Sequence, residues 1–188
     1  MVAMVATVTT YANESRNIIV KDAKRTAITL NVKQGNLLTI KDANGIILYK
    51  ETMEKEGVYT KGFDLSALPN GAYTVELNKD VQIEIMPFIV NDTEVVFNKD
   101  IETTVFKPVT RVKKDLVYVS KLALDEENLL VEIFFEENNT SAKDFNLVFS
   151  EKIENTKNLE RVYKLSKKGN YKIVYYSQDR VYTEYINN

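Results

Sequence analysis

Apolar and polar residues alternate along most of the chain from Thr26 onward. The runs 27–32 and 72–77 show this most clearly, because every second residue in them is large and apolar. A period of two is that of a β-strand with one buried face. Short segments rich in Asn, Asp and Gly separate the runs, and such residues favour hairpin turns. These segments lie at 34–36, 42–45, 68–71 and 78–80. The pattern predicts an all-β fold of antiparallel strands.

Segments of the first half have counterparts, in the same order, in the second half. Residues 35–40 are similar to 127–132, 47–51 to 147–151, and 70–75 to 168–173. Ordered self-similarity at a long period indicates a repeated structural unit. We therefore expect two tandem Ig-like antiparallel β-sandwich domains, residues 13–98 and 99–188, as diverged copies of one module. No linker rich in Pro, Gly or Ser separates them.

The first copy also contains a longer motif. A D-x-x-G turn at Asp42–Gly45 is followed by the segment D-L-S-A-L-P-N-G-A-Y-T-V at Asp64–Val75. This pattern resembles the C-terminal sorting domain of the bacterial type IX secretion system, and Lys168–Ile173 of the second copy is similar in outline. The resemblance implies an Ig-like sandwich, a secreted protein of a Bacteroidota-type bacterium, and the secretion machinery as a partner.

Residues 1–12 differ from the rest of the chain in that they carry no charge. They read MVAMVATVTTYA and end on small residues, which is typical of the apolar end of a secretory signal peptide. An apolar first strand is the alternative interpretation. No run approaches the ~18 apolar residues of a transmembrane helix. We expect a secreted, periplasmic or cell-surface location without a transmembrane segment.

Missing residue types exclude several chemistries. The 188 residues include no Cys and no His, so thiol nucleophiles, thiolate zinc sites and imidazole acid–base relays are ruled out. The formal net charge is −2, and neither half is basic enough for a nucleic-acid partner. No phosphate loop, dinucleotide fingerprint or G-x-S-x-G motif occurs. We expect no enzyme activity and no cofactor.

Acidic loops are the remaining candidates for a metal site. Oxygen-rich loops can bind calcium, but none of these has the ligand order of an EF-hand. We interpret them as turn formers and solvated charges, with no bound metal. They lie at Asp42 and Asn44, at 125–128 and at 136–139.

Aromatic residues gather in the last hairpin and predict an interaction surface. If Tyr171 faces the core as Tyr73 does, alternation directs Ile173 and Tyr175 inward. The outward side chains are then Lys172, Val174 and Tyr176. A semi-apolar patch of this kind suits a protein or glycan partner, or the other domain of the chain.

We expect the chain to be a non-enzymatic secreted or periplasmic β-sandwich protein that acts as a binding or structural module at the cell surface. One alternative is a sorting or anchoring domain for type IX secretion. Another is a carbohydrate-binding or carbohydrate-active protein.

Overall fold

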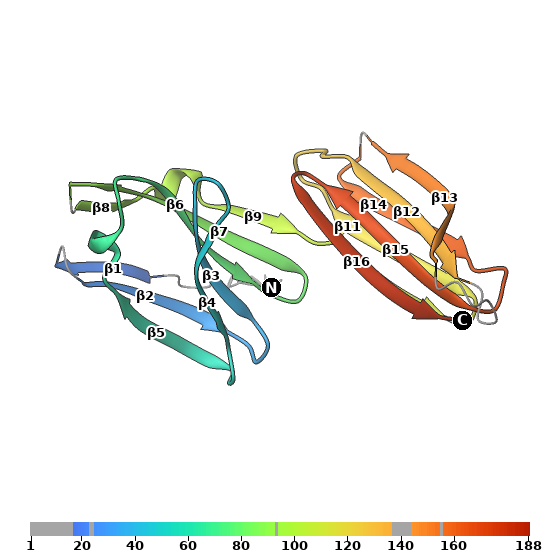
Figure 1. Ribbon diagram of the computed structural model, residues 1–188, viewed down its shortest axis with the longest axis horizontal. Helices are drawn as coiled ribbons and strands as arrows, with labels where there is room; N and C mark the ends of the chain where they lie inside the picture. Colours follow the sequence, from blue (N-terminus) through green and yellow to red (C-terminus); the bar gives the residue numbers. More distant parts are fainter. Residues whose placement is uncertain (1–16, 23–24, 93, 137–143, 155) are drawn as a thin grey trace, which may run out of the picture. The chain divides into compact units, whose positions relative to one another are not determined.

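The computed structural model describes residues 17–22, 25–92, 94–136, 144–154 and 156–188. Its contacts divide these residues into two compact units (Figure 1). Unit 1 comprises the described residues up to Asp80 together with Glu84–Thr103, and unit 2 comprises Val81–Ile83 and Thr104–Asn188. The boundary at residues 98 and 99 stays a prediction, and the signal peptide predicted at 1–12 lies outside the described residues.

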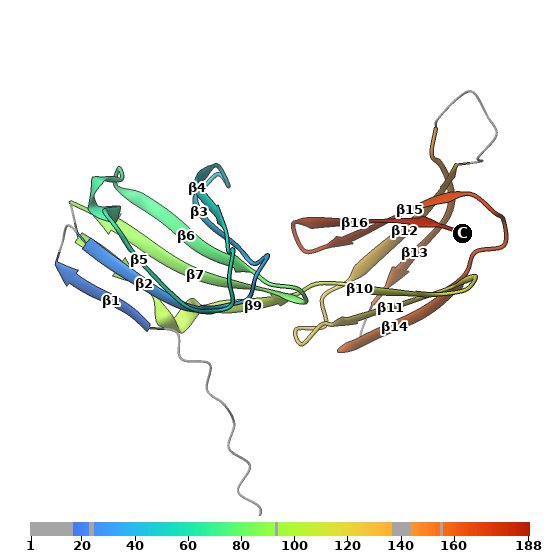
Figure 2. The same ribbon diagram turned by 90° about the horizontal axis from the view of Figure 1, so that it is seen from below.

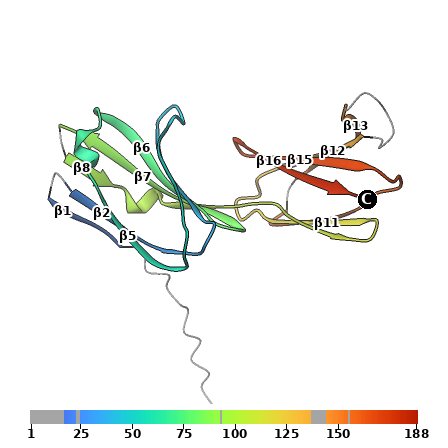
Figure 3. The same cartoon turned by 60° about the horizontal axis from the view of Figure 1, so that its bottom comes forward.

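Unit 1 is built from two sheets. One has the strand order β1-β2-β5, and comprises β1 (Asn17–Asp22), β2 (Arg25–Val32) and β5 (Gly57–Phe63). The other has the order β4-β3-β6-β7-β8, with β9 also paired to β7. Its strands are β3 (Leu37–Asp42), β4 (Ile47–Thr52), β6 (Gly71–Asn78), β7 (Gln82–Asn91), β8 (Glu94–Phe97) and β9 (Thr103–Phe106), of which β9 belongs to unit 1 only at Thr103. Figure 3 shows the first sheet as one layer facing β6 and β7. Two short 3₁₀ helices, η1 (Leu65–Ala67) and η2 (Lys99–Ile101), lie in the connections.

Unit 2 has the same strand order, except that its described residues include no counterpart of β8. Its three-stranded sheet runs β10-β11-β14 and its four-stranded sheet runs β13-β12-β15-β16. The strands are β10 (Val109–Lys113), β11 (Leu116–Leu122), β12 (Leu129–Glu136), β13 (Asn146–Ile153), β14 (Asn158–Lys164), β15 (Asn170–Ser177) and β16 (Arg180–Asn187). Figure 2 shows the two sheets of this unit as separate layers. The all-β sandwich prediction is confirmed in both units.

Each unit encloses a core of its own. Alternate residues of the strands are buried, such as Leu38, Val75 and Leu77 in unit 1 and Val131, Ile173 and Tyr175 in unit 2. Full burial of one such aliphatic side chain contributes roughly 1.5 to 3 kcal/mol relative to exposure in water. The period-two pattern therefore reflects the buried face of each sheet, which is the reason it predicts the strands.

A tyrosine ties the same crossover connection in both units. The hydroxyl of Tyr73 on β6 donates to the carbonyl oxygen of Pro69 at 2.7 Å, and that of Tyr171 on β15 donates to the carbonyl oxygen of Lys167 at 3.1 Å. Each bond reaches four residues back along the chain, which is the tyrosine corner of Ig-like sandwiches. The predicted inward orientation of Tyr171 is confirmed, since both rings are buried.

The strand registers correct one part of the sequence comparison. Ile40 pairs with Tyr49 and Val75 in unit 1, and Ile133 pairs with Phe149 and Ile173 in unit 2. Ile40 therefore corresponds to Ile133, and the comparison of residues 35–40 with 127–132 is wrong by one residue. A one-residue shift exchanges the two faces of a strand.

An edge strand is bulged at the same place in both units. Consecutive residues Ile40 and Lys41 pair with Tyr49 and Ile47, so Leu48 of β4 is the extra residue. In the same way Ile133 and Phe134 pair with Phe149 and Leu147, so Val148 of β13 is the extra residue. A bulge bends the strand and increases its twist.

Candidate functional site

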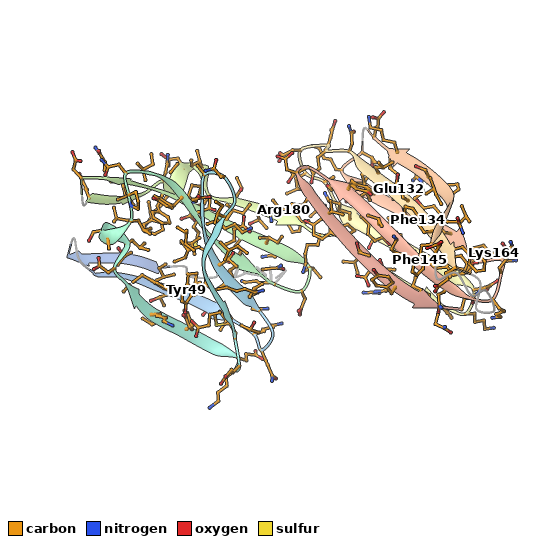
Figure 4. All side chains as sticks on the ribbon, viewed as in Figure 1. Tyr49, Glu132, Phe134, Phe145, Lys164 and Arg180 are labelled. Atoms are coloured by element: carbon orange, nitrogen blue, oxygen red, sulfur yellow. The ribbon has the colours of Figure 1, made fainter. Side chains whose placement is uncertain are left out.

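A carboxylate on β4 joins the two sheets at one edge of unit 1. Glu51 Oε2 accepts hydrogen bonds from the hydroxyl of Tyr59 at 2.7 Å and from Lys61 Nζ at 2.9 Å, both on β5. The hydroxyl of Tyr49, on β4 itself, also donates to this oxygen. Lys61 Nζ lies 5.0 Å from the centre of the Tyr49 ring. Figure 4 labels Tyr49 in this group. We call it the unit 1 clasp.

Hydrogen bonding sets the ionisation of the unit 1 clasp. The hydroxyl of Tyr49, then that of Tyr59, then Lys61 stabilise the charged carboxylate, and they lower the pKa of Glu51 to about 2. Burial, and then the bond to Glu51, raise the pKa of Tyr59. The bonds to Tyr49 and Glu51 raise the pKa of Lys61. At neutral pH Glu51 is therefore ionised and poorly suited to take up a proton, and the group serves to hold the sheets together.

Unit 2 has a second clasp at the corresponding place. Glu151 of β13 accepts a bond from Arg161 Nε at 2.7 Å and one from the hydroxyl of Tyr163 at 2.9 Å, both on β14. The rings of Phe149 and Tyr163 pack with their centres 5.5 Å apart. Burial, and then the bond to Glu151, raise the pKa of Tyr163.

The sequence comparison missed both clasps, although their positions are regularly related. Residues 49, 51, 61 and 63 of unit 1 correspond to 149, 151, 161 and 163 of unit 2. The signal was a carboxylate and an aromatic residue on one strand, followed about ten residues later by a cation and an aromatic residue at the same spacing. No catalytic or metal-binding motif has this pattern, and so comparison with such motifs does not detect it.

A cleft of about 550 Å³ lies beside the clasp of unit 2. Its apolar walls include Phe149, Leu165 and the ring of Tyr171. The ionisable side chains that line it are Glu151, Arg161, Tyr163, Lys164, Lys167 and Tyr171. Glu151 is the one carboxylate among them, so the lining carries more positive than negative charge. The cleft opens between β13 and β14, each of which is the outermost strand of its sheet.

The predicted interaction surface is only partly exposed. Tyr171, Ile173 and Tyr175 are buried as the alternation predicts, but Val174 is 7% exposed, so it offers little area for contact. Lys172 is half-buried and Tyr176 is exposed. A role of Lys172, Val174 and Tyr176 in binding stays a prediction.

Aromatic side chains extend that surface across the four-stranded sheet of unit 2. Lys172 Nζ lies 4.4 Å from the centre of the Phe134 ring and 5.2 Å from that of Phe145. The Phe145 ring meets that of Tyr185 with centres 6.0 Å apart. Figure 4 shows Glu132, Phe134 and Phe145 on this sheet, and a bond to Glu132 raises the pKa of Tyr176. We call Phe134, Phe145, Lys172, Tyr176 and Tyr185 the aromatic face.

The described acidic loops act as turns. Asp42 Oδ1 accepts bonds from the backbone N–H of Asn44 at 2.9 Å and of Ile46 at 2.8 Å, which closes the β3–β4 hairpin. Among the described residues, no group of three or more acidic side chains is placed to hold a metal ion. Residues 137–139 of the third loop lie outside the described residues.

Residues of the D-L-S-x-L-P-x-G-x-Y motif shape the crossover from β5 to β6 in unit 1. Leu65 is buried in the core, and the hydroxyl of Ser66 donates to Asp64 Oδ1 at 2.8 Å. Asn70 holds the far end, since its Nδ2 donates to Asp92 Oδ1 at 3.0 Å and its Oδ1 accepts from the Asp92 N–H at 2.9 Å. The motif is therefore a folded surface segment fixed at both ends.

One comparison with known proteins gives a match over this segment. No curated protein matches the chain. In the described part of the chain, no helix is long and apolar enough to span a membrane. Residues 23–91, which contain the motif and most of unit 1, match the model of the secretion system C-terminal sorting domain.

Proposed function

We propose that unit 1 is a sorting module for type IX secretion, and that it directs the chain to the cell surface or into the medium. The observation that carries this proposal is the match of residues 23–91 to the sorting-domain family. The sandwich fold of unit 1 and the motif at its β5–β6 crossover agree with it.

The crossover segment is the part of unit 1 that we expect the secretion machinery to contact. Asp64, Ala67, Pro69 and Asn70 are exposed, while Leu65 holds the segment to the core. Bonds at both ends keep it in one conformation before binding, which lowers the entropic cost of recognition.

Localisation of a reporter tests the proposal. A fluorescent protein with an export leader is fused ahead of the full chain and produced in a bacterium that has a type IX system, and in a strain that lacks it. We expect protease-accessible fluorescence at the surface or in the medium of the first strain and periplasmic fluorescence in the second. Equal distribution in both strains would rule out the sorting function.

A matched pair of variants locates the recognised segment. Asp64→Lys places a lysine at the exposed start of the unit 1 crossover, and Ser166→Lys places a lysine at the crossover of unit 2. We expect Asp64→Lys to retain more reporter in the periplasm than Ser166→Lys does. The reverse result would assign sorting to unit 2.

A second candidate function is that of a non-enzymatic binding or structural module at the cell surface. The aromatic face of unit 2 favours it, since exposed aromatic side chains are suited to protein or glycan contacts. Replacing Tyr176 and Tyr185 by Ser in the full chain should reduce its retention on purified cell envelopes. Unchanged retention of the variant would show that the aromatic face has no binding role. Loss of binding after glycans are removed from the envelopes would favour a carbohydrate partner.

A further inference from the structure

The cleft of unit 2 lies between two strands with free edges. Among the described residues, β13 pairs only with β12 and β14 pairs only with β11. The outer edge of each strand therefore presents backbone N–H and C=O groups, which can pair with an added strand.

The β13 edge lacks the features that usually prevent such pairing. Leu147, Val148 and Phe149 are consecutive and exposed at 53%, 55% and 44%. Neither proline nor a charged residue occurs in the first half of the strand, Asn146–Phe149. Edge strands that avoid pairing carry such residues. The charged residues Glu151 and Lys152 lie in the second half of the strand, and in the first half the bulge at Val148 affects a single position.

The β14 side of the cleft supplies positive charge. Arg161 is neutralised by Glu151 in the clasp. Lys164 Nζ lies 3.8 Å from Asp115 Oδ2 and its side chain is 71% exposed, so this ion pair is weak. Lys167 Nζ lies 5.4 Å from the centre of the Phe135 ring, at the end of the cleft. The two lysines give this rim a net positive charge.

These features together select one kind of occupant. An extended polypeptide can form backbone bonds with β13, and its alternate side chains then point to opposite faces. Carboxylates on the face that turns toward the cleft match Lys164 and Lys167, which line it. Apolar side chains on the other face lie beside Leu147, which pairs with Phe134 and is 53% exposed. We propose that unit 2 binds an extended segment of a partner protein, with alternating apolar and acidic residues, as an added strand on β13.

A designed peptide tests this proposal on the full chain. The probe alternates valine and glutamate over the eight residues that β13 spans, with blocked ends and a fluorescent label. One control alternates valine and lysine, and a second contains the valines and glutamates of the probe in two separate blocks. We expect fluorescence anisotropy to show binding of the alternating acidic probe at least about tenfold tighter than that of either control. Binding should also weaken as salt is raised. Equal affinities for the three peptides would overturn the proposal.

Charge variants on exposed residues test the orientation of the peptide. The double variant Lys164→Glu and Lys167→Glu should reverse the preference, so that the valine–lysine peptide binds more tightly. Val148→Asp should weaken binding of the acidic probe, whereas Leu48→Asp, at the matching bulge of unit 1, should leave it unchanged. A stronger effect of Leu48→Asp would overturn the assignment to β13.

Hydrogen exchange identifies the strand that pairs. The bound acidic probe should slow exchange of backbone amides in Asn146–Phe149 and leave those of β16 unchanged. Slowed exchange in β16, or in the aromatic face without change in β13, would contradict strand addition at this cleft. Because this experiment does not depend on export, its failure is distinguishable from failure of the sorting function.

Discussion

The two units share the order of their first seven strands but differ in surface chemistry at one place on the outer face of the larger sheet. Lys41 and Glu76 form an ion pair of 2.7 Å in unit 1. By register the corresponding residues of unit 2 are Phe134 and Val174. An ion pair thus lies on the sheet of the unit that matches the sorting family at the place where an aromatic and an aliphatic side chain lie on the sheet of the other. The buried residues determine the fold. The outward-facing residues can change without disturbing the core, and they can therefore differ in what they bind.

The largest expected difference between the units concerns the glycine before the corner tyrosine. Gly169 has φ of +152°, and a Cβ there would lie 2.7 Å from the backbone oxygen of Glu136. Gly169→Ala should cost about 2 to 4 kcal/mol of unfolding free energy. At Gly71 a Cβ would meet the Tyr73 ring at 3.7 Å, so Gly71→Ala should cost less than about 0.5 kcal/mol. Hydrogen exchange in β15 and β6 measures the two effects separately, and equal losses would contradict this comparison.

The corner tyrosines should instead behave alike. Tyr73→Phe removes one hydroxyl bond to a backbone carbonyl, and Tyr171→Phe removes such a bond together with the one that its hydroxyl accepts from the Lys167 N–H at 3.2 Å. Each should cost about 1 to 1.5 kcal/mol. Hydrogen exchange of the backbone amides in the strand that carries each tyrosine measures the local stability. Tyr185→Phe serves as the control, because Tyr185 is 70% exposed. A clear loss in one unit alone would mean that the two corners are not equivalent.

The unit 1 clasp should make the stability of unit 1 depend on pH. The pKa of Glu51 is about 2 in the folded chain against an ordinary value of 4.5. The contribution of the ionised Glu51 to the free energy of unfolding is therefore fully present above pH 4.5, and it is lost as the pH falls toward 2. Glu51→Gln should lower the unfolding free energy at pH 7 by about 1 kcal/mol and flatten its decline in acid. Carbon-detected NMR titration measures the pKa itself. The control is Glu56→Gln in the exposed β4–β5 connection, and a Glu51→Gln curve parallel to that of the unaltered protein would refute the assignment.

The smallest effects concern salt. Lys41→Met and Lys172→Met should each cost about 0.5 to 1 kcal/mol, the first by removing an ion pair and the second by removing cation–π contacts. The ion pair of Lys41 is 2.7 Å long and its side chains are 22% and 11% exposed, so about 1 M salt, with a Debye length of about 3 Å, should remove only a minor part of the cost of Lys41→Met. Chemical denaturation, and backbone amide exchange in β6 and β15, measure the two costs with and without salt. Complete loss of the Lys41→Met cost in salt would contradict a partly buried ion pair.

Strand positions and fold class could be predicted because alternation records which face of a strand is buried. The turn at Asp42 and the inward orientation of Tyr171 followed from turn chemistry and period. The correspondence of Ile40 with Ile133 was displaced by one residue, since both segments are rich in Leu and Ile and the pattern alone does not fix pairing across strands.

The candidate sites were harder to predict because they depend on contacts between distant strands. Glu51 and Lys61 are ten residues apart. They meet only because the sheet that contains β4 packs against the sheet that contains β5. Val174 was assigned to the outer face by alternation, but alternation gives no information on how far its neighbours cover it. Phe145 was absent from the predicted surface because its contact with Lys172 joins the start of β13 to β15.

The clasps imply an asymmetry in which mutations the chain tolerates. The carboxylate is Glu in both units, whereas the cation is Lys61 in one and Arg161 in the other, and Tyr49 corresponds to Phe149. Loss of one donor leaves the acceptor with others, but loss of the acceptor leaves several donors unsatisfied at once. Sequence drift should therefore be rapid at the donor positions and slow at Glu51 and Glu151, so that a single acidic residue per unit preserves the bridge between the two sheets while its surroundings change.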